Sequence, residues 1–229
     1  MVTTGKIFVV KESVSLADIA TKLKDRREEE TLEADGQTIT LLTEIRDLQL
    51  APGELQGIIS QDIPFDLNHH GKVTMAVRTI ESLFTFHQYE DRVFLMVLEK
   101  KNRANNFANM LSKILFITVA SIVEARIQPE VLRRFHEDNF DDTKIVFFDD
   151  IDIPNVDKLS LYGSALGNTS LYQEYLSHGK IWYTVIRSKR FGYIVGITRN
   201  AVITIFTRIE KTDFLNYTTN EIFSLVSRS

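Results

Sequence analysis

The chain contains no cysteine, and this absence removes several classes of function at once. Disulfides, thiolate nucleophiles and zinc sites with Cys ligands are all excluded. Proline and glycine are also scarce, with 4 and 10 residues, and the glycines are scattered singly. Neither the P-loop pattern nor the dinucleotide-binding glycine pattern is present. A cysteine-free composition fits an intracellular protein, and we expect a cytoplasmic one.

The sequence also lacks a long apolar run. The longest, residues 114–123, already contains Thr and Ser, whereas a membrane-spanning helix needs roughly 20 apolar residues. The N-terminus lacks the basic start and apolar centre of a signal peptide. We therefore expect a soluble protein without a membrane partner.

What is present is an ordinary globular composition. The 229 residues are 44% hydrophobic and include 15 Phe and 7 Tyr, enough for a sizeable core in one large domain or two small ones. The net charge of −4 hides strong segregation. Residues 1–70 and 136–160 are acidic, while residues 71–135 and 161–229 are basic. The basic blocks hint at a positive surface, although cations at sheet edges and turns also serve solubility alone.

Two stretches show the same order of elements, three strands followed by a helix. The first has strands near 55–63, 73–87 and 92–99 and a helix at 102–117. The second has strands near 180–187, 191–197 and 201–209 and a helix at 213–227. We therefore predict an α+β fold with antiparallel β-meanders in both halves, each followed by a covering helix. The expected units are 1–120 and 121–229, with a single domain as the alternative.

Several local patterns make finer predictions. In the helix at 102–117, Phe107, Leu111 and Leu115 share one face and should be buried. Ser15 should cap a helix that begins next to it, with Asp18 completing the capping box. The charge run 25–33 is interpreted as a solvated helix end or loop.

Basic and aromatic residues mark a candidate nucleic-acid surface in the two meander blocks. The candidates are Lys100, Lys101, Arg103, Arg187, Lys189, Arg190, Tyr193 and Arg199. Phosphates bind such cations, and an aromatic ring can stack on a base. The strand 189–196 partly resembles the ribonucleoprotein motif of RNA-recognition domains, but Arg190 and Gly196 depart from it. No family is assigned on this match.

An acidic group offers a second hypothesis. Asp149, Asp150 and Asp152 could hold Mg²⁺ through carboxylate oxygens, as in a metal-dependent phosphodiesterase or nuclease. The spacing does not fit an EF-hand, and a solvated acidic loop is the simpler interpretation.

No motif in the sequence specifies a reaction. We expect a non-catalytic cytoplasmic binding or regulatory protein without a cofactor, associated with nucleic acid through the basic meander surface. The metal-dependent enzyme is one alternative. A protein–protein interaction module, anchored by Trp182 or Tyr193, is the other. The sequence identifies neither the ligand nor the oligomeric state.

Overall fold

A computed structural model describes residues 2–34, 37–118, 121–139 and 143–227. The fold is α+β with a large antiparallel sheet, as the sequence predicts. Among the residues that the structure describes, no helix is both long and apolar enough to cross a membrane.

The chain divides into two compact units. Unit 1 comprises residues 1–7 and 124–229, and unit 2 comprises residues 8–123. Strand β1 (Thr3–Val10) contributes residues to both. The predicted domain boundary after residue 120 stays a prediction.

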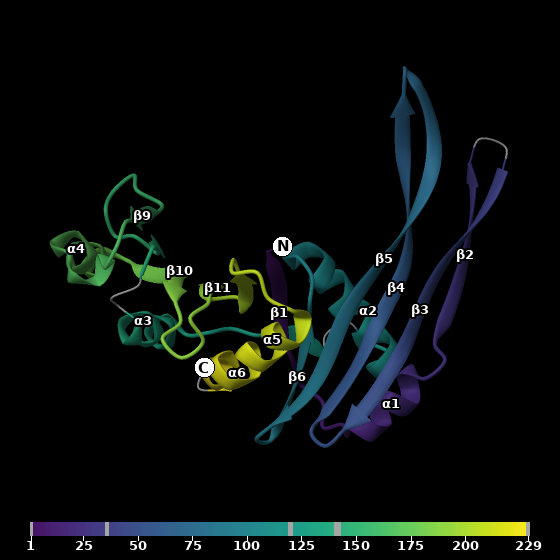
Figure 1. The fold of residues 1–229 in the computed structure, drawn as a ribbon, viewed down its shortest axis with the longest axis horizontal. Helices are drawn as coiled ribbons and strands as arrows, with labels where there is room; N and C mark the ends of the chain where they lie inside the picture. Colours follow the sequence, from purple (N-terminus) through teal and green to yellow (C-terminus); the bar gives the residue numbers. More distant parts are fainter. Residues whose placement is uncertain (1, 35–36, 119–120, 140–142, 228–229) are drawn as a thin grey trace. The chain divides into compact units, whose positions relative to one another are not determined.

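Unit 2 is built on strands in the order β2-β3-β4-β5-β6, each antiparallel to the next (Figure 1). The strands are β2 (Arg27–Ala34), β3 (Gln37–Ala51), β4 (Glu54–His69), β5 (Lys72–Tyr89) and β6 (Arg92–Val97). The helices are α1 (Leu16–Leu23) and α2 (Lys101–Phe116). A short strand, β7 (Ile122–Glu124), pairs with β1.

The helices of unit 2 cover one face of its sheet. The apolar stripe of α2 is buried as predicted, with Phe107, Leu111 and Leu115 all in the core. Alternate residues of β4 and β5 define the helix-covered face, because side chains alternate along a strand. These residues belong to the same hydrophobic cluster and are Leu55, Ile59, Phe84 and Phe86.

Helix α1 begins where the sequence predicts. Ser15 is the N-cap residue, and its hydroxyl accepts a hydrogen bond of 3.0 Å from the backbone N–H of Asp18. The interpretation of residues 25–33 as a helix end or loop is wrong, because most of them form β2. Charged side chains suit this strand, since it lies at the edge of the sheet and is exposed to water.

Unit 1 contains strands in the order β12-β11-β10-β8-β9, and the first residues of β1 pair with β12. The strands are β8 (Ile145–Asp149), β9 (Leu159–Tyr162), β10 (Lys180–Arg187), β11 (Ile194–Thr198) and β12 (Val202–Ile205). The helices are α3 (Pro129–Asp138), α4 (Ser170–His178), α5 (Lys211–Tyr217) and α6 (Phe223–Ser227), with a 3-10 turn η2 (Leu166–Asn168) and a π-helical turn η3 (Thr218–Ile222).

The helices of unit 1 gather on one face of its sheet. In Figure 1, α3, α5 and α6 lie below β10 and β11. Phe148 of β8 contacts Tyr175 of α4, with ring centroids 5.8 Å apart. Tyr193, which leads into β11, contacts Tyr217 of α5 at 6.0 Å. Because side chains alternate along a strand, the neighbours of these strand residues point to the opposite face.

Candidate nucleic-acid interface

Four aromatic rings gather on the sheet face of unit 1 that is opposite its helices. Phe147 of β8 lies at the centre. Its ring centroid is 5.3 Å from that of Tyr183, 5.5 Å from that of Trp182 and 5.6 Å from that of Tyr162. We call these four residues the aromatic platform.

A bulge in β10 builds this platform. The register with β8 shifts between Ile181 and Tyr183, so that Trp182 and Tyr183 together lie opposite the single residue Phe147. In a regular strand two neighbouring residues point to opposite faces, whereas a bulge can re-aim one of them. The rings of Trp182 and Tyr183 accordingly lie 5.8 Å apart, and both contact Phe147.

A glycine in β11 makes room for the platform. A Cβ atom on Gly196 would lie 2.5 Å from the Tyr183 hydroxyl oxygen and 3.0 Å from ring carbons of the same side chain. The Tyr183 ring therefore lies directly against the backbone of β11. Small polar groups continue the same face, because Thr204 lies opposite Gly196 and Thr198 lies opposite Tyr183.

The platform is accessible to different degrees. Tyr162 is 67% exposed, and the other three side chains are half-buried. Burial raises the pKa of the Tyr183 hydroxyl, and the nearby Tyr162 raises it further. The Tyr183 hydroxyl therefore stays neutral and can donate a hydrogen bond at physiological pH. Flat rings with neutral polar edges are suited to stacking against another planar group.

Cations border the platform at one end. The Lys158 ammonium lies 5.2 Å from the centre of the Trp182 ring. Arg199 is tied to the same region through its backbone N–H, which donates to the Trp182 carbonyl at 2.9 Å. At the far end of β10, Arg187 is exposed, and its guanidinium donates to the Gly192 carbonyl at 3.4 Å.

Each of the three aspartates of the metal hypothesis contacts a basic side chain. Arg199 forms a salt bridge with Asp149, and its second nitrogen lies 3.6 Å from a carboxylate oxygen of Asp150. The His178 Nδ1 lies 2.8 Å from a carboxylate oxygen of Asp152. Burial raises the pKa of Asp149, and the Arg199 charge opposes that shift. Within the described residues, no group of three or more His, Asp or Glu side chains could hold a metal ion.

The predicted basic turn lies between β10 and β11. Arg190 forms an ion pair of 3.3 Å with Glu221 and lies over the Phe191 ring at 5.2 Å. Lys189 is exposed, and its backbone N–H donates to the Asn139 side chain at 3.3 Å. Arg199 follows the other end of β11, so these cations mark opposite ends of that strand.

Tyr193 lies on the helix-covered face. Its ring is 5.7 Å from that of Phe191, and both contact Tyr217 of α5. Tyr193 is half-buried, and α5 covers part of its ring. Tyr193 is thus on one face of the sheet, and the rings of the platform are on the other.

The remaining predicted cations belong to unit 2. Lys100 and Lys101 are exposed at the start of α2, and Arg103 forms an ion pair of 3.0 Å with Glu99. The predicted continuity of these residues with the basic turn of unit 1 stays a prediction.

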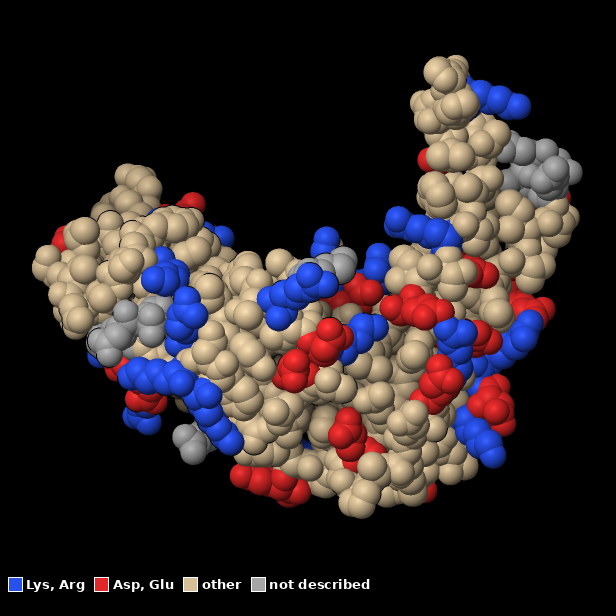
Figure 2. All heavy atoms as spheres, in the orientation of Figure 1, with Lys and Arg blue, Asp and Glu red and all other residues tan. Residues whose placement is uncertain are grey.

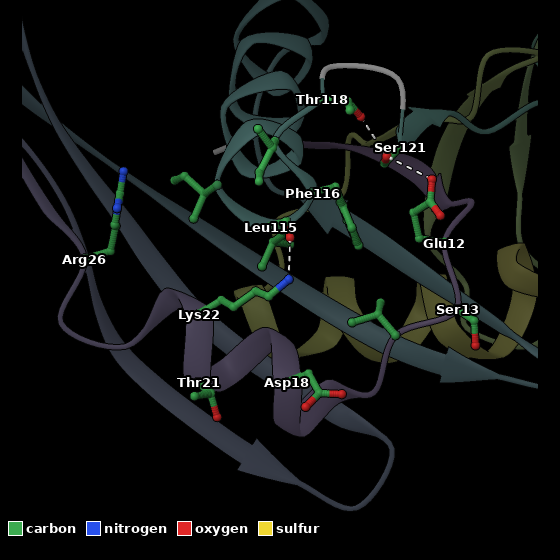
Figure 3. A pocket seen from close by; sticks show the side chains of 13 residues that line it. Glu12, Ser13, Asp18, Thr21, Lys22, Arg26, Leu115, Phe116, Thr118 and Ser121 are labelled. Atoms are coloured by element: carbon green, nitrogen blue, oxygen red, sulfur yellow. Dashed lines mark hydrogen bonds between the residues drawn. The ribbon is translucent and has the colours of Figure 1, made fainter.

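Unit 2 also contains an open depression of about 860 Å³ between α1 and the end of α2 (Figure 3). Several of its polar groups already have partners within the chain. Lys22 donates to the Leu115 carbonyl at 2.6 Å, and Ser121 donates to Glu12 at 3.1 Å. Figure 3 shows acidic and basic side chains together around the depression. Because charges of both signs surround the depression, it favours neither an anionic nor a cationic ligand.

No protein-family model matches the chain, and a search of curated proteins finds no significant similarity.

Proposed function

We propose that this protein is a non-catalytic binding protein that holds single-stranded nucleic acid on the aromatic platform of unit 1. The observation that carries the proposal is that the other three platform rings all contact Phe147 on a sheet face opposite the helices. Proteins bind unpaired bases by stacking them on such rings, and they do so with little dependence on sequence.

Single-stranded nucleic acid is the form that this surface suits. Stacking requires a base whose face is free, and bases inside a duplex are already stacked on each other. The platform consists of flat side chains from three neighbouring strands, β8, β9 and β10. Such a surface fits separate bases better than it fits the groove of a duplex. Duplex should therefore bind more weakly than a single strand.

The border cations provide the phosphate contacts in this proposal. Lys158 lies beside Trp182 at one end of the platform, and Arg187 is exposed at the end of β10. Arg199 is held by Asp149 and Asp150, so a phosphate would compete with carboxylates for it. Binding should weaken as salt rises, because phosphate contacts release counterions.

The covering helices determine which face of the strands the proposal leaves for a ligand. In unit 1, the helix that follows the meander contacts Tyr193 through Tyr217 and leaves the opposite face for the ligand. In unit 2, α2 covers the core side of the meander. A cytoplasmic regulatory role, as the composition suggests, is the setting that we propose for this binding.

The only tryptophan of the chain, Trp182, makes a direct test possible. A base stacked on the platform should quench its fluorescence. We would titrate the protein with a short single-stranded oligonucleotide and with the matching duplex, at low and moderate salt. Saturable quenching by the single strand that weakens with salt is the expected result.

Two variants separate platform binding from general attraction. Tyr162→Ala removes the most exposed ring of the platform and should weaken binding roughly 5- to 150-fold, the effect of one lost base stack. Leu171→Ala removes a side chain that is 49% exposed from α4 of the same unit and should leave affinity unchanged. Unmeasurable binding at low salt, or equal loss in both variants, would refute the proposal. In that case Trp182 would be better interpreted as an anchor for a protein partner.

A further inference from the structure

Two ribbons of unit 2 extend beyond the part of the sheet that the helices cover. The last pair between β3 and β4 towards the hairpin ends is Thr43 with Gln61. Past this pair, β4 and β5 remain paired with each other as far as His69 and Lys72. Figure 1 shows the β2–β3 and β4–β5 hairpins running past α1 and α2 in the same direction. We call the outer parts the first ribbon (residues 28–34 and 37–43) and the second ribbon (residues 62–69 and 72–79).

The core-side face of the second ribbon stays apolar beyond the core. The alternation that buries Ile59 continues through Ile63, Phe65 and Leu67, because the ladder of β4 with β5 has no register shift. Phe65 is 37% exposed and Leu67 is 49% exposed. In Figure 2 the end of this ribbon is mostly tan, which marks uncharged residues. A two-stranded ribbon with exposed apolar side chains gains stability when another surface covers it.

The first ribbon continues the same face of the sheet. Ile45 of β3 is buried in the core, and the alternation places Leu41 and Ile39 on the same side further out. Their partners in β2 are Glu30 and Leu32. Both ribbons therefore carry aliphatic side chains on the same face of the sheet. Closer to the helices, this face is buried in the core.

The charges of the first ribbon on this face are acidic. Glu30 pairs with Leu41, and Glu28 pairs with Thr43, so both glutamates share the face with the aliphatic side chains. Glu28 also forms a salt bridge with Arg26, at the approach to the ribbon. Glu30 lies further out and is exposed.

The charges of the second ribbon on this face are basic. Arg78 pairs with Ile63, and Lys72 pairs with His69 at the tip. The Arg78 guanidinium lies 5.7 Å from the centre of the Phe65 ring. The acidic side chains of this ribbon, at 62 and 66, lie on the opposite face because they alternate with the apolar positions. One ribbon is thus apolar and acidic, and the other is apolar and basic.

We propose that the two ribbons form a homodimer interface, in which the first ribbon of each copy packs against the second ribbon of the other. A second copy is the partner whose chemistry the chain itself supplies, because each molecule carries both complementary surfaces. Two equivalent contacts then close the assembly, as expected for a two-fold symmetric dimer. Each contact buries the apolar face of a ribbon and brings glutamates next to cations, which favours correct pairing.

The test is the oligomeric state of the full chain, measured by sedimentation over a range of protein concentrations. The wild-type protein should dimerise. Lys72→Glu with Arg78→Glu makes both ribbons acidic, and Glu28→Lys with Glu30→Lys makes both basic. Each double variant should raise the dissociation constant about tenfold or more, because attractive pairs become repulsive.

Mixing the two double variants provides the decisive measurement. In a heterodimer of the two variants, the acidic first ribbon of one meets the basic second ribbon of the other, and the acidic second ribbon meets the basic first ribbon, so both contacts join opposite charges. A heterodimer should therefore form through both contacts at a concentration where neither variant dimerises alone.

The control variant keeps the ribbons intact. Lys100→Glu with Lys101→Glu changes the net charge as much as the first double variant but lies outside the ribbons, and it should leave the dimer unchanged. Circular dichroism of each variant verifies folding. A monomeric wild-type protein, dimers that resist both charge reversals, or a mixture that stays monomeric would each overturn the proposal.

Discussion

The two units both place helices on one face of antiparallel strands but leave different surfaces uncovered. In unit 1 the uncovered face is a cluster of aromatic rings, mostly half-buried, with threonines beside it. In unit 2 the uncovered surface is at the outer parts of two ribbons and carries apolar side chains that are mostly aliphatic, such as Leu67. Rings offer flat faces to a planar ligand, whereas aliphatic side chains gain most from being buried by another protein surface. The difference indicates two kinds of partner for the two units.

The largest expected effect concerns the closed core of unit 2. Leu111→Ala removes a fully buried side chain from the contact of α2 with the sheet. It should lower the free energy of unfolding by about 2–5 kcal/mol, because it leaves a cavity. Leu171→Ala in α4 of unit 1 is the control, since that side chain is 49% exposed and should cost little. Denaturant unfolding measures both. Equal effects would contradict the assignment of the core face of α2.

That core face is predictable because its signal is local. Apolar residues repeat along α2 with helical spacing, and the cap of α1 needs only Ser15 and Asp18. The edge strand β2 escapes prediction because a run of charges resembles a loop when the pairing with β3 is unknown. Strand β9 escapes for a similar reason, since its pairing with β8 is what identifies it.

Most of the candidate site is not predictable, because it depends on contacts between residues far apart in sequence. The bulge that turns Trp182 and Tyr183 to one face is a register shift against β8, which no local pattern reveals. The sequence places Arg199 and Asp149 in separate hypotheses, one for phosphate and one for metal, yet they form one ion pair. The adjacent aromatics at 182 and 183 are the local signal that points to the platform.

The next prediction compares the pH dependence of stability that two buried histidines contribute, one in each unit. Burial lowers the pKa of His136 in unit 1 from 6.5 to about 4, although the charge of Glu137 acts in the other direction. Its Nδ1 lies 2.9 Å from the Tyr172 hydroxyl oxygen. The unfolded chain binds a proton near pH 6.5, so this contribution to stability is complete above that pH and is lost between pH 6.5 and about 4. The loss should approach roughly 3 kcal/mol.

His136→Gln should flatten this pH dependence, as measured by denaturant unfolding at several pH values. The control in unit 2 is His87→Gln. Burial also lowers the pKa of His87, but Glu54 opposes the shift from 3.6 Å, so its contribution should be smaller. A pH profile that changes more in the His87 variant would contradict the comparison.

Alanine substitution at two glycines compares the closed core of unit 2 with the open sheet face of unit 1. A Cβ on Gly57 in unit 2 would lie 2.7 Å from the ring of Phe84, which is fully buried. A Cβ on Gly196 in unit 1 would meet the ring of Tyr183, which is half-buried and has more room to shift. Gly57→Ala should therefore cost about 1–3 kcal/mol, the usual range for overpacking. Gly196→Ala should cost less stability.

Gly196→Ala should nevertheless disturb the aromatic platform. The displaced Tyr183 ring contacts both Trp182 and Phe147, so the emission of Trp182 should change even where unfolding does not. Gly57→Ala should leave that emission as it is. If Gly196→Ala left Trp182 fluorescence unaltered, the close contact of Tyr183 with β11 would be wrong.

The smallest expected effect is a gain in stability at Ile117. This residue ends α2 with a φ of 65°, in the left-handed region that a β-branched side chain adopts at a cost of about 1–2 kcal/mol. Its side chain is 93% exposed, so removing it loses little packing. Glycine adopts this conformation freely, although it also adds entropy to the unfolded chain. Ile117→Gly should therefore raise the free energy of unfolding by roughly 0.5–1 kcal/mol.

The matched position in unit 1 is Ala201, which has a φ of 51° at the turn between β11 and β12. Ala201 is fully buried, so Ala201→Gly removes a packed methyl group while it relieves the same kind of backbone strain. These two effects oppose each other, and the net change should lie below that of Ile117→Gly. Thermal unfolding of the two variants gives the comparison directly. A larger gain at Ala201 than at Ile117 would show that burial of the methyl group does not offset the strain, and that exposure is not what separates the two positions.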